Sequence, residues 1–163
     1  MVNTNELRTY QQWIGCLDYL SKKKVTDEFI DNLKYGLCPG IEMVMPHFLE
    51  RVQDTVNQMM NRSTRICTAL LNESLEDGDF SNVESNLYRC YRDIKHCRFY
   101  LNIKFIPESF VIELDEKTVS ETNRYWKEVH KVLTQLAEET GNEEIYDLLY
   151  YMNRLIKKDR RNG

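Results

Sequence analysis

The stretch that decides the fold is residues 81–105, SNVESNLYRCYRDIKHCRFYLNIKF. Its apolar residues recur at alternating intervals of four and three, the spacing that forms one side of a helix. They are Val83, Leu87, Cys90, Ile94, Cys97 and Leu101. The pattern predicts a helix with one buried side, and it places Arg89, Arg92 and His96 on the opposite side. This stretch therefore indicates a helical fold and a basic outer surface.

The same spacing recurs in two further long segments. Residues 46–75 are predicted to form the longest helix, with Pro46 in its first turn. Another helix follows Thr118 and ends at Gly141, and Asn142 is expected to cap a last helix. A short acidic turn precedes Ser81, which is the expected cap of the deciding helix. Short turns between such helices favour an antiparallel four-helix bundle over residues 41–160.

The N-terminal part of the chain predicts two shorter helices. The first covers residues 4–20 with Thr4 as its cap, and the second covers residues 27–35 with Thr26 as its cap. Gly36 is expected to end the second helix in the left-handed conformation. Together they form an N-terminal helical hairpin over residues 1–38. Because no linker composition separates this hairpin from the bundle, we expect a single helical domain, residues 1–163.

The segment around residues 100–115 leaves two alternatives open. Its sequences LNIKF and SFVIEL both alternate apolar and polar residues, and the residues at Pro107 between them could close a short β-hairpin. In the second alternative, one helix ends near Lys104 and another begins at Pro107. The helical alternative is favoured because an isolated two-stranded hairpin is marginally stable. The predicted fold class is therefore all-α.

Composition indicates a folded chain and narrows the function classes. The 163 residues are 42% hydrophobic and include 2 Trp, 10 Tyr and 6 Phe, which excludes a disordered chain. The net charge of -4 does not indicate a general nucleic-acid binder. We find no signal-peptide pattern and no run of apolar residues that would span a bilayer. The 5 cysteines lie mostly in helical patterns, so we expect reduced thiols and a cytoplasmic location.

Charge is unevenly distributed along the sequence. Residues 84–104 contain five cations against two acids, whereas residues 107–147 contain eleven acids against four cations. A chain with this polarity can bind an anionic partner locally although its net charge is negative. The basic outer side of the deciding helix is therefore the predicted binding surface.

We expect this surface to bind a protein or a nucleic acid, because cations interleaved with aromatic rings suit both kinds of partner. The predicted partner-binding residues are Arg89, Arg92, Lys95, His96, Arg98, Phe99, Tyr100 and Ile103. The last three are apolar and need a cover, which is either the N-terminal hairpin or a second subunit of a homo-oligomer. The favoured function is a non-enzymatic interaction or regulatory protein.

An enzymatic alternative rests on Arg124 and His130, which are separated by five residues. This Arg-x5-His pattern resembles the active-site motif of the HEPN helical-bundle ribonucleases. The resemblance implies a metal-independent ribonuclease in which Arg124 holds phosphate and His130 assists proton transfer or positions the scissile bond. A tyrosine follows the arginine here, where those enzymes usually have another polar residue.

Cysteine and histidine spacing does not predict a metal or cofactor site. Cys90 and Cys97 are seven residues apart on one helix, so about 10.5 Å of helical rise separates them. Neither a disulfide nor a zinc ion can bridge that distance. His96 projects away from the apolar side of its helix, which removes it from a central site. We therefore expect buried thiols, no metal and no cofactor.

The order of elements over residues 46–140 is similar to small bacterial four-helix-bundle proteins. These include the proteins encoded in intervening sequences of ribosomal RNA genes and the accessory proteins of diversity-generating retroelements. The likeness implies nucleic-acid or reverse-transcriptase partners and ring-shaped oligomers. The acidic composition of this chain departs from that group.

Overall fold

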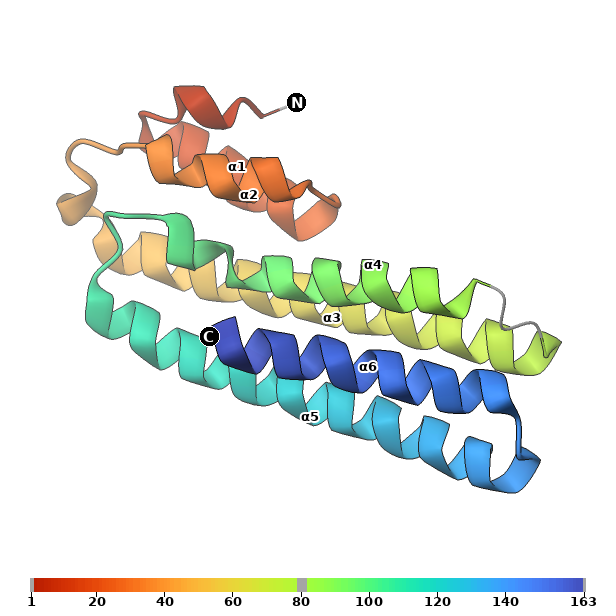
Figure 1. The fold of residues 1–163 in the computed structure, drawn as a ribbon. Helices are drawn as coiled ribbons and strands as arrows, with labels where there is room; N and C mark the ends of the chain where they lie inside the picture. Colours follow the sequence, from red (N-terminus) through yellow and green to blue (C-terminus); the bar gives the residue numbers. More distant parts are fainter. Residues whose placement is uncertain (1, 79–81, 163) are drawn as a thin grey trace. The chain divides into compact units, whose positions relative to one another are not determined.

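The computed structural model describes the backbone of residues 2–78 and 82–162 and the side chains of residues 2–78 and 82–154, and this part of the chain is mainly helical. The α-helices are α1 (Tyr10–Lys22), α2 (Asp27–Asn32), α3 (Met45–Asp77), α4 (Val83–Lys95), α5 (Glu108–Thr140) and α6 (Glu143–Asn162) (Figure 1). Four 3-10 helices accompany them: η1 (Thr4–Glu6), η2 (Leu33–Tyr35), η3 (Ile41–Met43) and η4 (His96–Asn102). The described residues contain no strand, so the predicted all-α class is confirmed and the β-hairpin near residues 100–115 does not form.

The chain divides into two compact units, each assembled from two separate stretches. Unit 1 comprises Met1–Ser63 and Asp93–Val119, and unit 2 comprises Thr64–Arg92 and Ser120–Gly163. Unit 1 contains the predicted N-terminal helical hairpin, formed by α1 and α2. Unit 2 contains segments of α3, α4, α5 and α6, and from α4 on each of these helices runs opposite to the one before it in the chain, as the antiparallel bundle predicts. The single domain over residues 1–163 stays a prediction.

The core of unit 1 is built around Trp13, which is fully buried on α1. The rings of Phe48 and Phe105 meet it edge-on, with ring centroids 6.2 Å and 5.1 Å from that of Trp13. Edge-to-face contacts at these distances are the favoured geometry for aromatic pairs. The Trp13 indole N–H donates a hydrogen bond to the backbone oxygen of Leu37 at 2.9 Å, so its one polar atom is satisfied.

The start of the first long N-terminal helix differs from the sequence prediction. Thr4 begins only the short η1, and α1 begins at Tyr10 with Thr9 as its cap. The backbone N–H of Gln12 donates to the Thr9 hydroxyl at 3.2 Å, and the Gln12 side chain accepts from the Thr9 backbone N–H at 3.1 Å. This reciprocal capping box satisfies two free helix donors, which a lone threonine at position 4 cannot do.

Gly36 is required for space and not for a left-handed backbone. Its φ is −74°, so the predicted left-handed helix end is wrong. A Cβ atom at this position would lie 2.3 Å from the Trp13 ring, closer than any real contact. The glycine thus allows the chain after η2 to pass directly against the central tryptophan.

Several other predicted helix ends are confirmed. The Thr26 hydroxyl accepts the Phe29 backbone N–H at 3.1 Å at the start of α2. Gly141 has a φ of 65° after α5, and the Asn142 side chain accepts from the Glu144 backbone N–H at 2.9 Å at the start of α6. The expected cap at Ser81 lies outside the described residues.

The deciding stretch changes helix type near its end. The predicted apolar side is buried at Val83, Leu87, Cys90, Ile94 and Cys97. Leu101, however, is 48% exposed, so its predicted burial is wrong. The α-helical geometry ends at Lys95, and Arg98 within η4 leaves helical geometry altogether. Because a 3-10 helix turns about 120° per residue, the α-helical periodicity no longer predicts which side chains face inward.

Candidate functional site

The structure separates the predicted partner-binding residues into exposed and buried groups. Arg89, Arg92 and Lys95 are exposed, and Arg98 is half-buried. The remaining four residues are buried: His96, Phe99, Tyr100 and Ile103. A surface made from all eight residues is therefore not available to a partner in this structure. The exposed part of the predicted surface is confined to α4.

His96 is buried because the N-terminal hairpin covers it within unit 1. Its Nε2 atom lies 2.6 Å from an Asp27 carboxylate oxygen, at the first residue of α2. Nearby, the Lys24 ammonium lies 3.2 Å from the Asp93 carboxylate. Both pairs join the hairpin to the end of the deciding stretch. Of the two covers expected from the sequence, the structure contains the hairpin.

Arg98 and Tyr100 converge on one carboxylate of α5 within unit 1. Arg98 donates two hydrogen bonds to the two Asp115 oxygens, at 2.8 Å and 2.9 Å, and the Tyr100 hydroxyl donates to Asp115 at 2.7 Å. Burial alone would raise the pKa of Asp115, but the hydrogen bonds from Arg98 and Tyr100 outweigh it, and the pKa is lowered. Burial raises the pKa of Tyr100. The three side chains form a structural network.

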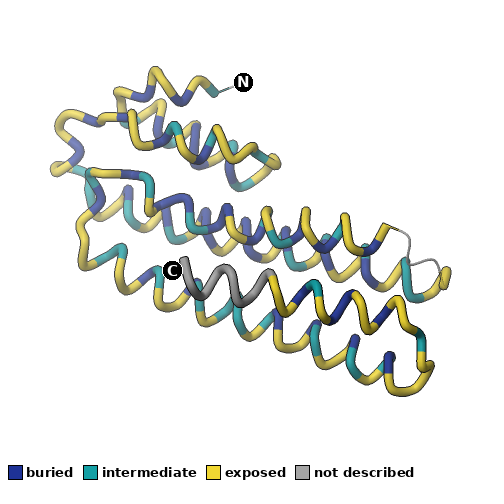
Figure 2. Tube along the Cα trace, in the orientation of Figure 1, coloured by how far each residue is buried: buried dark blue, intermediate teal, exposed yellow. Residues whose placement is uncertain are grey.

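Unit 2 presents a different arrangement on its part of α4. Arg89 and Arg92 are exposed, and Tyr88 beside them is 48% exposed. Neither arginine forms an ion pair with any side chain that the structure describes. Exposed and buried positions alternate along this helix, as Figure 2 shows. An exposed basic side with an adjacent aromatic ring is thus present in unit 2.

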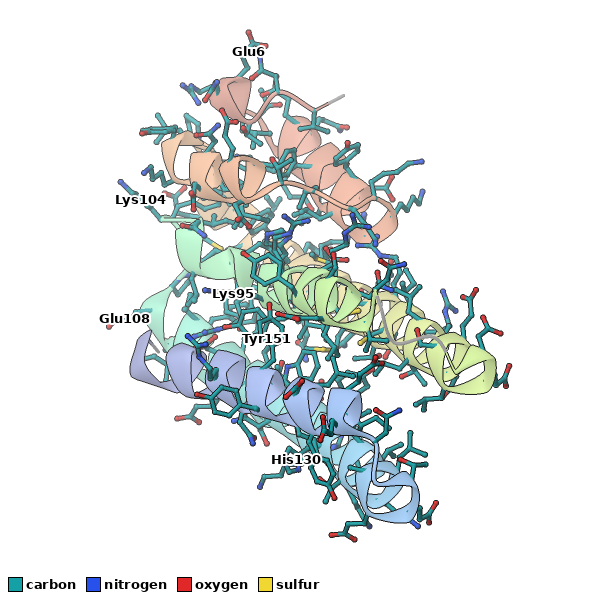
Figure 3. All side chains as sticks on the ribbon, turned by 45° about the vertical axis from the view of Figure 1, so that its right-hand side comes forward. Glu6, Lys95, Lys104, Glu108, His130 and Tyr151 are labelled. Atoms are coloured by element: carbon teal, nitrogen blue, oxygen red, sulfur yellow. The ribbon has the colours of Figure 1, made fainter. Side chains whose placement is uncertain are left out.

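Helix α6 adds a tyrosine next to this surface that the sequence did not single out. Tyr151 is half-buried on α6, which lies beside α4 (Figures 1 and 3). Burial raises the pKa of Tyr151, the nearby Glu84 and Tyr88 raise it further, and Arg154 lowers it. Acid, tyrosine and arginine occur in the same order on α4 and α6, and this repeated order is the signal that could have identified Tyr151.

Arg124 and His130 both lie on α5 in unit 2 (Figure 3 shows His130). Arg124 is exposed, and His130 is half-buried with its Nδ1 atom 3.4 Å from the Thr134 hydroxyl. Six residues of helix separate them by about 9 Å of rise and about 120° around the axis. Their side chains therefore leave α5 in different directions.

The cysteines and acidic residues do not form a metal centre in the described part of the chain, where no group of three potential ligands was found. All five cysteines are buried and outside any disulfide; burial was predicted for Cys90 and Cys97, whereas Cys38, whose place before Pro39 favours an accessible thiol, is only 7% exposed. Burial raises the pKa of Cys16 and that of Cys97 to about 12 each. Such thiols remain protonated near neutral pH and act as small packing residues.

Comparisons with protein families, with curated proteins and with solved structures found no match to this chain. Within the described residues, none of the helices combines the length and the apolar composition needed to cross a membrane.

Proposed function

We propose that this protein is a non-enzymatic interaction module that binds a protein or nucleic-acid partner through the basic outer side of α4. The observation that carries the proposal is the pair Arg89 and Arg92, exposed on one helix with Tyr88 and without ion-pair partners among the described side chains. We call these three residues the α4 basic face. All three lie in unit 2.

The chemistry of the α4 basic face suits binding. A guanidinium group offers five donors in a fixed fork that matches carboxylate or phosphate oxygens. Tyrosine adds apolar area with a polar tip at a small cost in conformational entropy. Arginine and tyrosine are enriched among the residues that dominate protein interfaces. Because neither arginine forms an ion pair with a side chain that the structure describes, a partner can pair with them without first breaking such a contact.

The positions of Arg124 and His130 favour this proposal over a HEPN-like ribonuclease. A phosphate-binding arginine and a proton-transferring histidine must reach the same scissile group. The two residues leave α5 about 120° apart around its axis, which does not direct them to one phosphate. This geometry therefore favours the interaction module over the ribonuclease.

The proposal is tested by reversing the charge of the α4 basic face. The wild type and the Arg89→Glu/Arg92→Glu variant are used as bait in the native lysate, and captured macromolecules are compared by mass spectrometry and RNA sequencing. The matched control is Lys127→Glu/Lys131→Glu, an equal charge change at exposed positions of α5. We expect the α4 variant alone to lose its partners. Identical capture by both variants would contradict the proposal.

A further inference from the structure

Helices α4 and α6 carry the same order of side-chain types. In each helix an acidic residue precedes a tyrosine by four positions, and an arginine follows that tyrosine by four positions in α4 and by three in α6. Side chains at these spacings lie on one side of a helix. The six residues, here called the α4–α6 face, are Glu84, Tyr88, Arg92, Asp147, Tyr151 and Arg154. All are exposed except Tyr151, which is half-buried.

The two helices lie side by side within unit 2 and run in the same direction (Figure 1). Figure 3 shows Tyr151 on α6, where it lies close enough to Glu84 and Tyr88 of α4 for both to influence its pKa. Because the helices run in the same direction, both acids lie at one end of the face and both arginines lie at the other. The tyrosines occupy the middle.

We propose that the α4–α6 face binds the same face of a second copy of this chain. The two copies are related by a two-fold axis that lies between the two faces at the level of the tyrosines, at right angles to the helices. This proposal rests on the proposed function and names the partner. The two-fold axis makes each helix antiparallel to the same helix of the other copy. A contact of this kind uses one patch twice and must therefore be complementary to itself.

The charge order of the face meets that requirement. Such an axis places the residue four positions before Tyr88 opposite the residue four positions after it, about 6 Å along the helix on either side. Glu84 thus faces Arg92 of the partner subunit. Asp147 faces the partner's Arg154 with an offset of one residue, about 1.5 Å along the helix. The symmetry operation generates each pair twice, so four oppositely charged pairs surround the stacked tyrosines.

Other occupants fit the face less well. A parallel arrangement of two copies would place acids against acids and arginines against arginines, which is unfavourable at close range. An extended phosphate chain running along the face would meet the arginines at one end and the carboxylates at the other. The face therefore favours a partner that presents cations opposite its acids and carboxylates opposite its arginines. An inverted second copy presents its charges in this order.

Charge reversal at two positions tests the register of the contact. In Glu84→Arg, position 84 repels Arg92 of the partner subunit, and in Arg92→Glu, position 92 repels the partner's Glu84. Each variant alone should therefore be a monomer at the concentration at which the wild type is a dimer. When the two variants are mixed, every pair is again of opposite charge, and a heterodimer should form. The readout is mass by sedimentation equilibrium, against the chain mass of 19.5 kDa.

Matched controls separate this effect from misfolding and from general charge effects. Glu128→Arg and Lys127→Glu make the same charge changes at exposed positions of α5 and should leave the dimer intact. Restoration by mixing also demonstrates that each variant is folded, because two misfolded chains would not recover a dimer. Far-ultraviolet circular dichroism of each variant provides a second check.

The outcomes distinguish this proposal from the proposed function. A monomeric wild type, a dimer unaffected by either reversal, or two monomeric variants that stay monomeric when mixed would each overturn self-association through this face. If the wild type is monomeric but still captures another macromolecule through Arg89 and Arg92, the proposed function stands and only self-association fails. If charge reversal changes neither the mass nor the captured partners, both proposals fail.

Discussion

The two units use their charged residues in opposite ways. In unit 1, Lys24 lies 3.2 Å from Asp93 and Arg98 lies 2.8 Å from Asp115, and the His96 ring shares a hydrogen bond of 2.6 Å with Asp27. Each of these pairs joins two different segments of the chain, which are 17 positions apart for Arg98 and Asp115 and 69 for His96 and Asp27. In unit 2, no ion pair forms between the side chains that the structure describes.

This difference shows that the charged side chains of one protein can serve two purposes, which are stabilising the fold and binding a partner. A charged pair that is partly withdrawn from water depends strongly on both members, because removal of one leaves the other desolvated. A solvated charge contributes little to stability and is available for binding. The charged pairs of unit 1 suit stabilisation of the fold, whereas the solvated charges of unit 2 suit binding.

The largest expected effect is common to both units, because buried apolar side chains carry stability in each. Leu87 in unit 2 and Ile94 in unit 1 are each 1% exposed. Replacing either with alanine should lower the free energy of unfolding by about 2–5 kcal/mol, through lost burial and the cavity that remains. Urea unfolding followed by circular dichroism measures the loss.

Leu101→Ala is the matched control for these substitutions. Leu101 follows the same sequence pattern but is 48% exposed, so its replacement should change stability by less than about 0.5 kcal/mol. An equal loss at Leu87 and Leu101 would contradict the observed end of the apolar side.

The next effect separates the two units. Asp115→Ala in unit 1 removes the acceptor for the hydrogen bonds of Arg98 and Tyr100 and should cost about 1–3 kcal/mol. Arg89→Ala in unit 2 removes a solvated charge and should cost less than about 0.5 kcal/mol. Comparable losses in the same urea experiment would remove the distinction between the units.

The Asp115 contribution should also depend on pH. The pKa of Asp115 is lowered from its ordinary value of 3.8 in the folded protein. A lowered folded-state pKa gives stability that is present above the ordinary pKa and is lost as pH falls through the lowered one. The stability difference between the wild type and Asp115→Asn should therefore shrink as the pH falls below about 4. A stability difference that grows as the pH falls would contradict the lowered pKa of Asp115.

The smallest expected effect concerns His130 in unit 2. Because Arg124 and His130 leave α5 in different directions, His130→Ala should not change the rate at which purified protein cleaves a fluorescent single-stranded RNA. The control is a preparation carrying Thr134→Ala, which removes the hydroxyl that lies beside His130 and keeps the His130 side chain. If the wild type cleaves RNA and His130→Ala abolishes the cleavage, the ribonuclease replaces the interaction module as the function.

Local sequence signals account for most of the helices and for only part of the candidate site. Periodicity placed α3 within two residues of its observed ends, and single residues such as Thr26 and Asn142 identified helix starts. The first helix was predicted too early because Thr4 looked like a cap, whereas the threonine with a glutamine three positions later is Thr9. Gly36 was assigned to backbone conformation because sequence alone does not show the adjacent Trp13 ring.

The exposure of the predicted partner-binding residues followed the sequence pattern less well, because it depends on distant parts of the chain. His96 has the helical position of an outer residue, yet its partner Asp27 lies 69 positions away in the sequence. Phe99 and Tyr100 lie within η4, where the α-helical periodicity no longer applies. The repeated order of acid, tyrosine and arginine indicates Tyr151, but only the structure shows that α6 lies beside α4.

The sequence by itself determined which segments are helical and which side of each long helix is apolar. These properties depend on residues within about four positions of one another, and such residues are visible in any local window. Only the tertiary structure decided which polar sides remain exposed. The N-terminal hairpin covers the end of the deciding stretch in unit 1, whereas α4 and α6 in unit 2 keep a charged, tyrosine-centred face open to solvent. Burial of an outer side is a property of contacts between distant segments, so helical periodicity cannot specify it.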